Sequence, residues 1–203
     1  SQNFSDYNTL SHWSEFNNKW NYNKIESNYN GRPADIHDIF SIDSMTYLTS
    51  SKGLVVIDRT DNNWNILTQN DGLKDEALWD LDLHGNSLYI ATKFGISEVS
   101  IVSNTVIPNK DNWIEAFDNI EIYDIETDSV YFYVSSANGL FKISHESEKI
   151  QKISNRKFKK IQIIDEMIWG LEYSLWWINL NGNESKYENG ITDFFIHQDF
   201  VWA

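Results

Sequence analysis

Three aspartates recur at a fixed position in a chain that is rich in carboxylates. Each stands nine residues before a tyrosine: Asp38 before Tyr47, Asp80 before Tyr89 and Asp124 before Tyr133. Paired carboxylates can act as acid and base in glycoside hydrolysis. A carboxylate that returns once per repeat instead favours a structural role, in which its oxygens accept hydrogen bonds from backbone N–H groups. We therefore interpret these aspartates as structural and expect no catalytic residue among them.

The other residue types that carry chemistry form no recognisable active site. The five histidines include no His-Glu-x-x-His pair, and no Gly-x-Ser-x-Gly sequence is present. We interpret His84 and His145, which lie in polar turns, as solvated. The chain contains no cysteine, which excludes disulfides, thiol nucleophiles and thiolate metal sites. The sequence therefore predicts a protein that is not an enzyme and that uses no metal and no cofactor.

Charge and composition restrict the class of partner. The net charge of −14 repels phosphate backbones, so we expect no nucleic acid partner. No run reaches the roughly 18 apolar residues of a spanning helix, so we expect no membrane insertion by this segment. Hydrophobic residues make up 41% and aromatic residues 15% of the chain, which is enough to build a core. The abundant asparagine between short apolar runs favours an all-β fold.

The elements that position these residues are repeated. The stretches "TYLTSSKGLVVID" (46–58), "LYIATKFGISEVS" (88–100) and "FYVSSANGLFKIS" (132–144) each read as a strand, a turn with glycine and a second strand. Their tyrosines are 42 and 44 residues apart, and each hairpin is preceded by one strand and followed by another. Such a period predicts a β-propeller of four-stranded antiparallel blades. The glycines are expected to supply positive φ or a close backbone approach.

We divide the chain as a single propeller domain or propeller segment, with about four blades and a partial fifth. The predicted blades cover residues 31–70, 71–115, 116–157, a degenerate blade at 158–190 and a partial blade at 191–203, with outer strands of a flanking blade at 1–30. Two interpretations stay open. The chain is a fragment of a larger propeller, which we favour, or a five-bladed ring closed by the N-terminal strands.

The repeats resemble a known family. "NDGLKDEALWDLDLHGNSLYIATKFGISEVS" (70–100) and "NGRPADIHDIFSIDSMTYLTSSKGLVVID" (30–58) are similar to the two-component-regulator propeller repeat. The fourth copy departs from it, with Ser174 at the place of the glycine. The resemblance implies a periplasmic or extracellular protein of the bacterial cell envelope, typically the sensor part of a two-component system that recognises oligosaccharides. It also implies that the remaining blades or a signalling module lie elsewhere in such proteins.

Propeller geometry suggests where a ligand binds. The loops that lead into each first strand and the turns between the second and third strands emerge on the same face, which we call the loop face. We predict a ligand site there, for an oligosaccharide or a protein, formed by Arg32, Lys52, Asp71, Lys74, Lys93, Phe94 and Asn138. The first hypothesis is a non-enzymatic ligand sensor. The alternatives are a protein-interaction scaffold in envelope assembly or secretion and, third, a carbohydrate-active enzyme.

Overall fold

The computed structural model describes most of the chain as β-structure. It covers residues 9–14, 19–24, 35–61, 63–108, 112–164, 167–197 and 200–202, and the side chains of 35–61, 63–108, 112–164 and 167–194. Four four-stranded antiparallel sheets follow one another along the chain, which confirms the all-β propeller fold. Within the described residues, no helix is both long enough and apolar enough to cross a membrane.

Each sheet, or blade, is built from four consecutive strands. The first blade contains β3 (Ile36–Ile42), β4 (Met45–Ser50), β5 (Gly53–Asp58) and β6 (Asn63–Leu67). The second contains β7 (Leu78–His84), β8 (Ser87–Thr92), β9 (Gly95–Ser100) and β10 (Thr105–Ile107). The third contains β11 (Ile122–Thr127), β12 (Tyr131–Ser136), β13 (Gly139–Ser144) and β14 (Ile150–Ser154). The fourth contains β15 (Lys160–Ile164), β16 (Met167–Leu171), β17 (Ser174–Asn179) and β18 (Glu184–Asn189). Two short helices, η1 (Gln69–Asp71) and α1 (Asn112–Glu115), lie in the links between blades.

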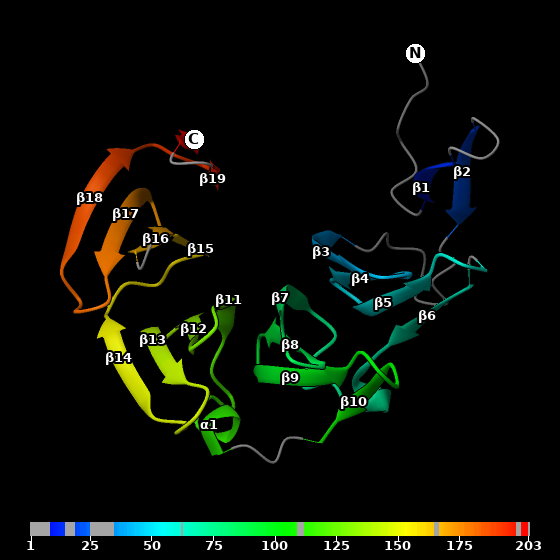
Figure 1. The fold of residues 1–203 in the computed structure, drawn as a ribbon, viewed down its shortest axis with the longest axis horizontal. Coiled ribbons are helices and arrows are strands. Elements are labelled where there is room, and N and C mark those ends of the chain that lie inside the picture. The colour runs from blue at the N-terminus through cyan, green and yellow to red at the C-terminus, as the bar shows by residue number, and fades with distance from the viewer. Residues whose placement is uncertain are drawn as a thin grey trace.

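The four blades stand side by side along an arc (Figure 1). Their first strands, β3, β7, β11 and β15, are neighbours at the inside of the arc, and the later strands of each blade lie progressively farther out. The inner edge of this arc therefore gathers one strand from every blade. Residues that are far apart in the sequence meet there.

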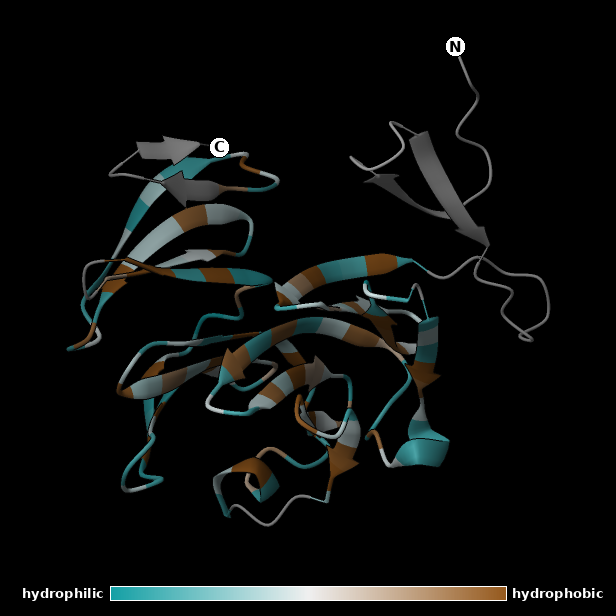
Figure 2. Ribbon diagram, turned by 45° about the vertical axis from the view of Figure 1, so that its right-hand side comes forward, coloured by the Kyte–Doolittle hydropathy of each residue, from teal (hydrophilic) through white to brown (hydrophobic). Residues whose placement is uncertain are grey.

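The core lies between the blades rather than within a single layer. The tyrosine that marks each repeat packs toward the following blade, and Tyr47, Tyr89 and Tyr133 are all buried. The Tyr47 hydroxyl also donates a hydrogen bond to Asn104 Oδ1 of the second blade at 2.6 Å. Hydrophobic residues concentrate along the strands and hydrophilic ones in the turns (Figure 2). The apolar strands thus join neighbouring blades, as the repeat predicted.

The repeated serine or threonine and the glycine close the second turn of the first three blades. Ser50 Oγ, Thr92 Oγ1 and Ser136 Oγ donate to the carbonyls of Gly53, Gly95 and Gly139 at 2.8, 2.8 and 3.0 Å. Gly53 has φ +121°, and a Cβ there would lie 2.3 Å from the Leu67 carbonyl oxygen. Both expected reasons for glycine, positive φ and close backbone approach, therefore apply at this turn.

Two hairpins flank the four blades. β1 (Thr9–Ser14) pairs with β2 (Lys19–Lys24), and β19 (Phe195–His197) pairs with β20 (Phe200–Trp202). Each forms a separate two-stranded sheet, and among the described strands neither hairpin pairs with the other. The domain bounds and the choice between a fragment and a closed ring stay predictions. The rest of the 1–30 segment lies outside the described residues.

Candidate ligand-binding site at the propeller axis

A β-bulge opens the first strand of three blades. The pairing of β3 with β4 shifts register between Ile36 and Asp38, that of β7 with β8 between Leu78 and Asp80, and that of β11 with β12 between Ile122 and Asp124. The extra residues are His37, Trp79 and Tyr123, which occupy equivalent places in the three blades. An extra residue is left out of the hydrogen-bonded ladder, and a bulge can re-aim its side chain.

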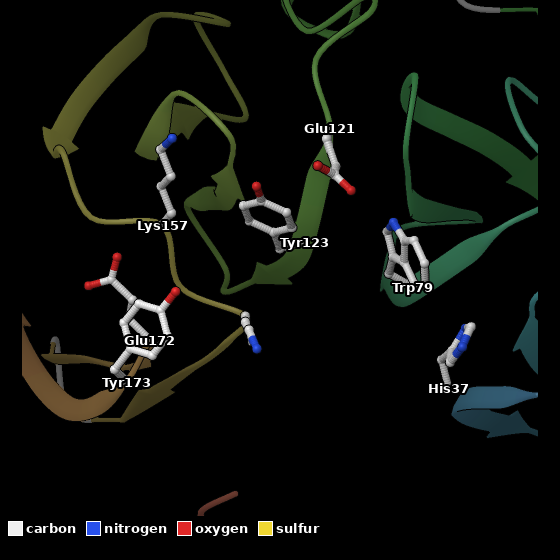
Figure 3. A pocket seen from close by; sticks show the side chains of 8 residues that line it. His37, Trp79, Glu121, Tyr123, Lys157, Glu172 and Tyr173 are labelled. Carbon is white, nitrogen blue, oxygen red and sulfur yellow. The ribbon is translucent and has the colours of Figure 1, made fainter. Parts of the chain in front are cut away.

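These three bulge residues line one cavity of about 490 Å³ on the inside of the arc. The remaining lining residues are Glu121, Lys157, Lys159, Glu172 and Tyr173, which we call with them the axial cavity. Figure 3 shows His37 and Trp79 on one side, Glu172 and Tyr173 on the opposite side, and Tyr123 between them. The cavity thus takes residues from all four blades, and its size is that of an ordinary small-ligand site.

Local contacts fix the rings on one wall. His37 donates its Nδ1–H to the Leu78 carbonyl of the next blade at 2.6 Å, and its ring centroid lies 5.0 Å from that of Trp79. The Trp79 indole Nε1 is buried and has no hydrogen-bond partner among the described residues. With less than 1 Å² of accessible surface, this nitrogen is closed to a ligand in the present arrangement, so Trp79 meets the cavity through other atoms of its ring.

Tyr123 and Glu121 form the next part of the wall. Burial raises the pKa of the Tyr123 phenol, and the charge and hydrogen bond of Glu121 raise it further. The phenol therefore stays protonated at neutral pH, which keeps a hydroxyl donor next to a carboxylate acceptor. Such a pair can match the alternating donors and acceptors of a hydroxyl-rich ligand.

An ion-pair network supports the opposite wall. Arg156 Nη1 lies 3.5 Å from Glu172 Oε2, and Arg156 Nε lies 3.0 Å from Glu184 Oε1. The guanidinium carbon is 3.2 Å from the centroid of the Trp176 ring, and Ser154 Oγ donates to Glu184 Oε2 at 2.8 Å. Stacking on Trp176 and the two carboxylates hold the Arg156 guanidinium in place, and the guanidinium in turn fixes the position of the Glu172 carboxylate at the cavity wall.

The recurring carboxylates directly follow the bulge residues in the sequence. Asp80 Oδ2 accepts from the backbone N–H of Ile125 at 2.9 Å, and Asp124 Oδ2 accepts from that of Ile161 at 3.2 Å. Each bond reaches from one blade to the first strand of the next, which is a structural role. Asp82 repeats the contact one step farther along the strand, accepting from the Thr127 N–H at 2.6 Å.

These carboxylates are crowded, which affects their protonation. Burial, followed by the charge of Asp38, raises the pKa of Asp80 well above its ordinary value. Burial and the charge of Asp80 do the same for Asp124. Burial raises the pKa of Asp82 to about 6 and, with the charges of Asp82 and Asp38, that of Glu126 to about 8. We name Asp38, Asp80, Asp82, Asp124 and Glu126 the axial carboxylate cluster. In the described part of the chain, no three such side chains are arranged to hold a metal ion.

The interpretation of two histidines as solvated turn residues was wrong. The rings of His84 and His145 lie with their centroids 3.7 Å apart, and both contact the Phe132 ring. His145 Nε2 is 3.1 Å from Thr127 Oγ1. Burial, followed by the charge of His84, lowers the pKa of His145. Aromatic packing between two blades accounts for the pair, which the polar neighbours in the sequence concealed.

The loop face exists as predicted. The turns of the first and third blades bond to the residues that lead into their own first strands, with Ser51 N–H donating to the Asp35 carbonyl and Ala137 N–H to that of Glu121, at 2.9 and 2.8 Å. The six of the seven chosen residues that the structure describes do not line the axial cavity, however. Arg32 lies outside the described residues.

The other chosen residues occupy separate places along the outer part of the face. Asp71 accepts from the Thr68 N–H at 2.8 Å in a helix cap, and Lys74 pairs with Asp118 beside a smaller cavity of about 210 Å³. Lys93 Nζ lies 5.7 Å from the centroid of the Phe94 ring, whose side chain is 45% exposed. Lys52 and Asn138 lie in turns in which their backbone N–H groups donate to serine hydroxyls. Their predicted ligand contacts stay predictions.

The sequence did contain a signal for the bulge residues. Each directly precedes a recurring aspartate, in the pairs His37-Asp38, Trp79-Asp80 and Tyr123-Asp124. A ring side chain that changes from copy to copy, next to a residue that does not change, marks a position freed from the structural pattern. Comparing the copies at that position would have identified the axial cavity.

Searches against known proteins find similarity of fold. No protein-family model matches the chain, and no curated protein matches it. Among solved structures, one described as the extracellular domain of the hybrid two-component system BT3049 from B. thetaiotaomicron superposes with a TM-score of 0.70 at 12% identity, over 91% of this chain and 28% of that one. The extracellular domain of BT4673 from the same organism gives 0.68 at 14% identity, over 89% and 27%.

A third structure comes from a different system. PorZ, a surface component of the type-IX secretion system of Porphyromonas gingivalis, gives a TM-score of 0.61 at 10% identity, over 93% of this chain and 25% of PorZ. This chain thus spans about a quarter of the length of each of these three solved chains. At these identities the likeness concerns the fold: the chain is a β-propeller built like segments of extracellular and surface propellers.

Proposed function

We propose that the chain is a ligand-binding segment of an extracytoplasmic propeller, periplasmic or extracellular, which acts as the sensor part of a two-component system and recognises a glycan in the axial cavity. The observation that carries the proposal is the cavity itself. Three equivalent bulges direct His37, Trp79 and Tyr123 into it, and Tyr173 stands opposite.

Aromatic faces with hydroxyl, carboxylate and ammonium groups between them suit a ligand that has apolar C–H faces and hydroxyl edges. Sugar rings combine both properties. The aromatic rings supply contact area with little loss of rotamer freedom, while Glu121, Glu172 and the two lysines supply hydrogen bonds. The sensors of similar fold support the assignment to a two-component system.

The test is binding to an array of defined oligosaccharides, followed by calorimetric titration of any that bind. Trp79→Ala and Tyr123→Ala are expected to weaken binding by about tenfold or more each, since each removes a ring from the cavity wall. Trp64→Ala is the matched control, because Trp64 is a partly exposed tryptophan on the outermost strand of the first blade. An array without any binding, or equal affinity in all three variants, would overturn the proposal.

A second candidate is a protein-interaction scaffold in envelope assembly or secretion. The fold it shares with PorZ favours it, together with the exposed Phe94 at the outer loop face. This candidate predicts a stoichiometric protein complex that Phe94→Ala weakens and Trp79→Ala does not. Co-purification from the native envelope with each variant separates the two candidates.

A further inference from the structure

A second cavity adjoins the axial one. It has a volume of about 530 Å³ and lies between the fourth blade and the link that follows β18, so we name it the outer cavity. Lys159, Glu172 and Tyr173 line both cavities. The remaining lining residues of the outer cavity are Lys160, Leu171, Gly190, Ile191, Thr192 and Asp193. The two cavities therefore share one wall, and we name them together the groove.

Tyr173 stands at the junction of the two cavities. Its side chain is 82% exposed, although a phenol ring in a turn gains by packing against its neighbours. It lies in the turn between β16 and β17, where the first three blades have Lys52, Phe94 and Asn138 one place before their glycine. An exposed ring with a cavity on either side can stack against a ligand that passes from one to the other.

The polar groups along the groove differ in how far they are already engaged. Asp193 pairs with Lys160 at 2.7 Å and Glu172 with Arg156, so both carboxylates are held by cations. Lys159 is exposed, and in the described part of the chain no carboxylate lies within ion-pair distance of its ammonium group. Its ammonium donors are thus available, at the junction, to oxygens of a ligand.

We infer that the groove binds an extended oligosaccharide through two subsites, the axial and the outer cavity, with Tyr173 stacking on the sugar unit that bridges them and Lys159 donating to its oxygens. This inference rests on the proposed glycan-binding function and adds the length of the ligand and a second site to it. A ligand confined to the axial cavity contacts Tyr173 from that cavity alone, whereas a longer one also contacts it from the outer cavity.

The experiment compares chain lengths on two variants. For a sugar series that binds, affinities of the two-unit and six-unit oligosaccharides are measured by calorimetric titration. The six-unit ligand is expected to bind at least about tenfold more tightly to the unaltered protein. Tyr173→Ala should weaken the six-unit ligand by a larger factor than the two-unit ligand, because the longer ligand contacts this ring from both cavities. Lys159→Gln should also weaken the longer ligand more than the shorter.

Two controls accompany these variants. Tyr187→Ala removes a tyrosine that is 55% exposed on β18 of the same blade, away from both cavities. Lys149→Gln removes an exposed lysine in the turn between β13 and β14, at the opposite end of the strands from the loop face. Both controls are expected to keep the length advantage.

The outcomes separate this inference from the function on which it rests. If no oligosaccharide binds, the glycan proposal fails. If two-unit and six-unit ligands bind equally, or if Tyr173→Ala weakens both by the same factor, the axial cavity binds glycans alone and the outer subsite is overturned. Thermal unfolding of each variant confirms that an exposed substitution has left the fold intact.

Discussion

The carboxylate of Asp80 accepts a hydrogen bond at 2.9 Å from the backbone N–H of Ile125, across the boundary between the second and third blades. Asp124 makes the same kind of bond to the fourth blade. A polar contact thus joins neighbouring first strands at the inside of the arc, while apolar side chains join the blades farther out. Two of the three recurring acids, Asp80 and Asp124, therefore link neighbouring blades.

This link predicts opposite effects for two substitutions of one residue. Asp80→Asn keeps an oxygen for the Ile125 N–H and removes a charge that burial and Asp38 disfavour, so stability at neutral pH should be unchanged or higher. Asp80→Ala leaves that N–H without its partner and should cost about 1–3 kcal/mol. Urea unfolding measures both, with Glu146→Gln, an exposed turn residue, as control. An equal loss in both variants would show that the charge, not the acceptor, matters.

The axial carboxylate cluster predicts that stability falls as pH rises. The folded protein raises the pKa of Asp82 from 3.8 to about 6 and that of Glu126 from 4.5 to about 8. The folded state therefore holds protons that the unfolded chain releases, and this stabilisation is lost as pH rises from about 4 through about 8. Urea unfolding over this range should show a decreasing free energy of unfolding on its alkaline side, and the Asp82→Asn, Glu126→Gln double variant should flatten it.

His145 acts in the opposite direction at lower pH. Its pKa is lowered in the folded protein by burial and by His84, so the unfolded chain takes up a proton more readily. Stability from this source is present above about pH 6.5 and is lost as pH falls through the folded value. The same titration with His145→Phe should lose this acidic decrease. If the substitution leaves the pH dependence of the free energy of unfolding unchanged, a group other than His145 causes the loss of stability at acidic pH.

Two glycines should respond differently to the same substitution. An alanine Cβ at position 53 would lie 2.3 Å from the Leu67 carbonyl oxygen at φ +121°, whereas one at position 85, with φ +60°, would have nothing within 4 Å. Gly53→Ala should therefore cost more than about 2 kcal/mol and Gly85→Ala about 1 kcal/mol. Thermal and urea unfolding of the two variants test the difference. Similar losses would mean that the backbone at Gly53 moves to admit the methyl group.

Phe94 and Trp79 distinguish the two sets of candidate site residues. The sequence predicted a ligand site on the loop face that includes Phe94, and the structure offers the axial cavity around Trp79. We expect Phe94→Ala to leave glycan affinity within about twofold and Trp79→Ala to lower it by about tenfold or more. Calorimetric titration of both variants with the same oligosaccharide measures the two affinities. A larger loss of affinity in Phe94→Ala than in Trp79→Ala would indicate that the ligand binds at the turns of the loop face.

The fold could be predicted because its determinants are local and repeated. The spacing of Tyr47, Tyr89 and Tyr133, with glycine six residues after each, carries both the inter-blade packing and the turn conformation. A structural role for Asp80 and Asp124 also followed from recurrence alone. These features recur in the first three copies, so comparing those copies was enough.

The site could be predicted only as far as its face. The axial cavity depends on register shifts in three strands and on residues from four blades that meet only in space. Turn residues such as Asp71 and Lys74 are polar and exposed in the sequence pattern, but a helix cap and an ion pair engage them. Nothing in the sequence around His84 and His145 indicates that their rings stack across a blade boundary.

The bulges also bear on how such a protein can change over generations. A residue in a strand is constrained by its cross-strand neighbour, but the extra residue of a bulge has none, so His37, Trp79 and Tyr123 are free to differ while the ladder beside them stays intact. Duplication of a repeat therefore adds a blade together with one bulge position whose side chain can vary. Selection can then change the ligand that the protein recognises by substituting one bulge residue at a time, while the fold is preserved.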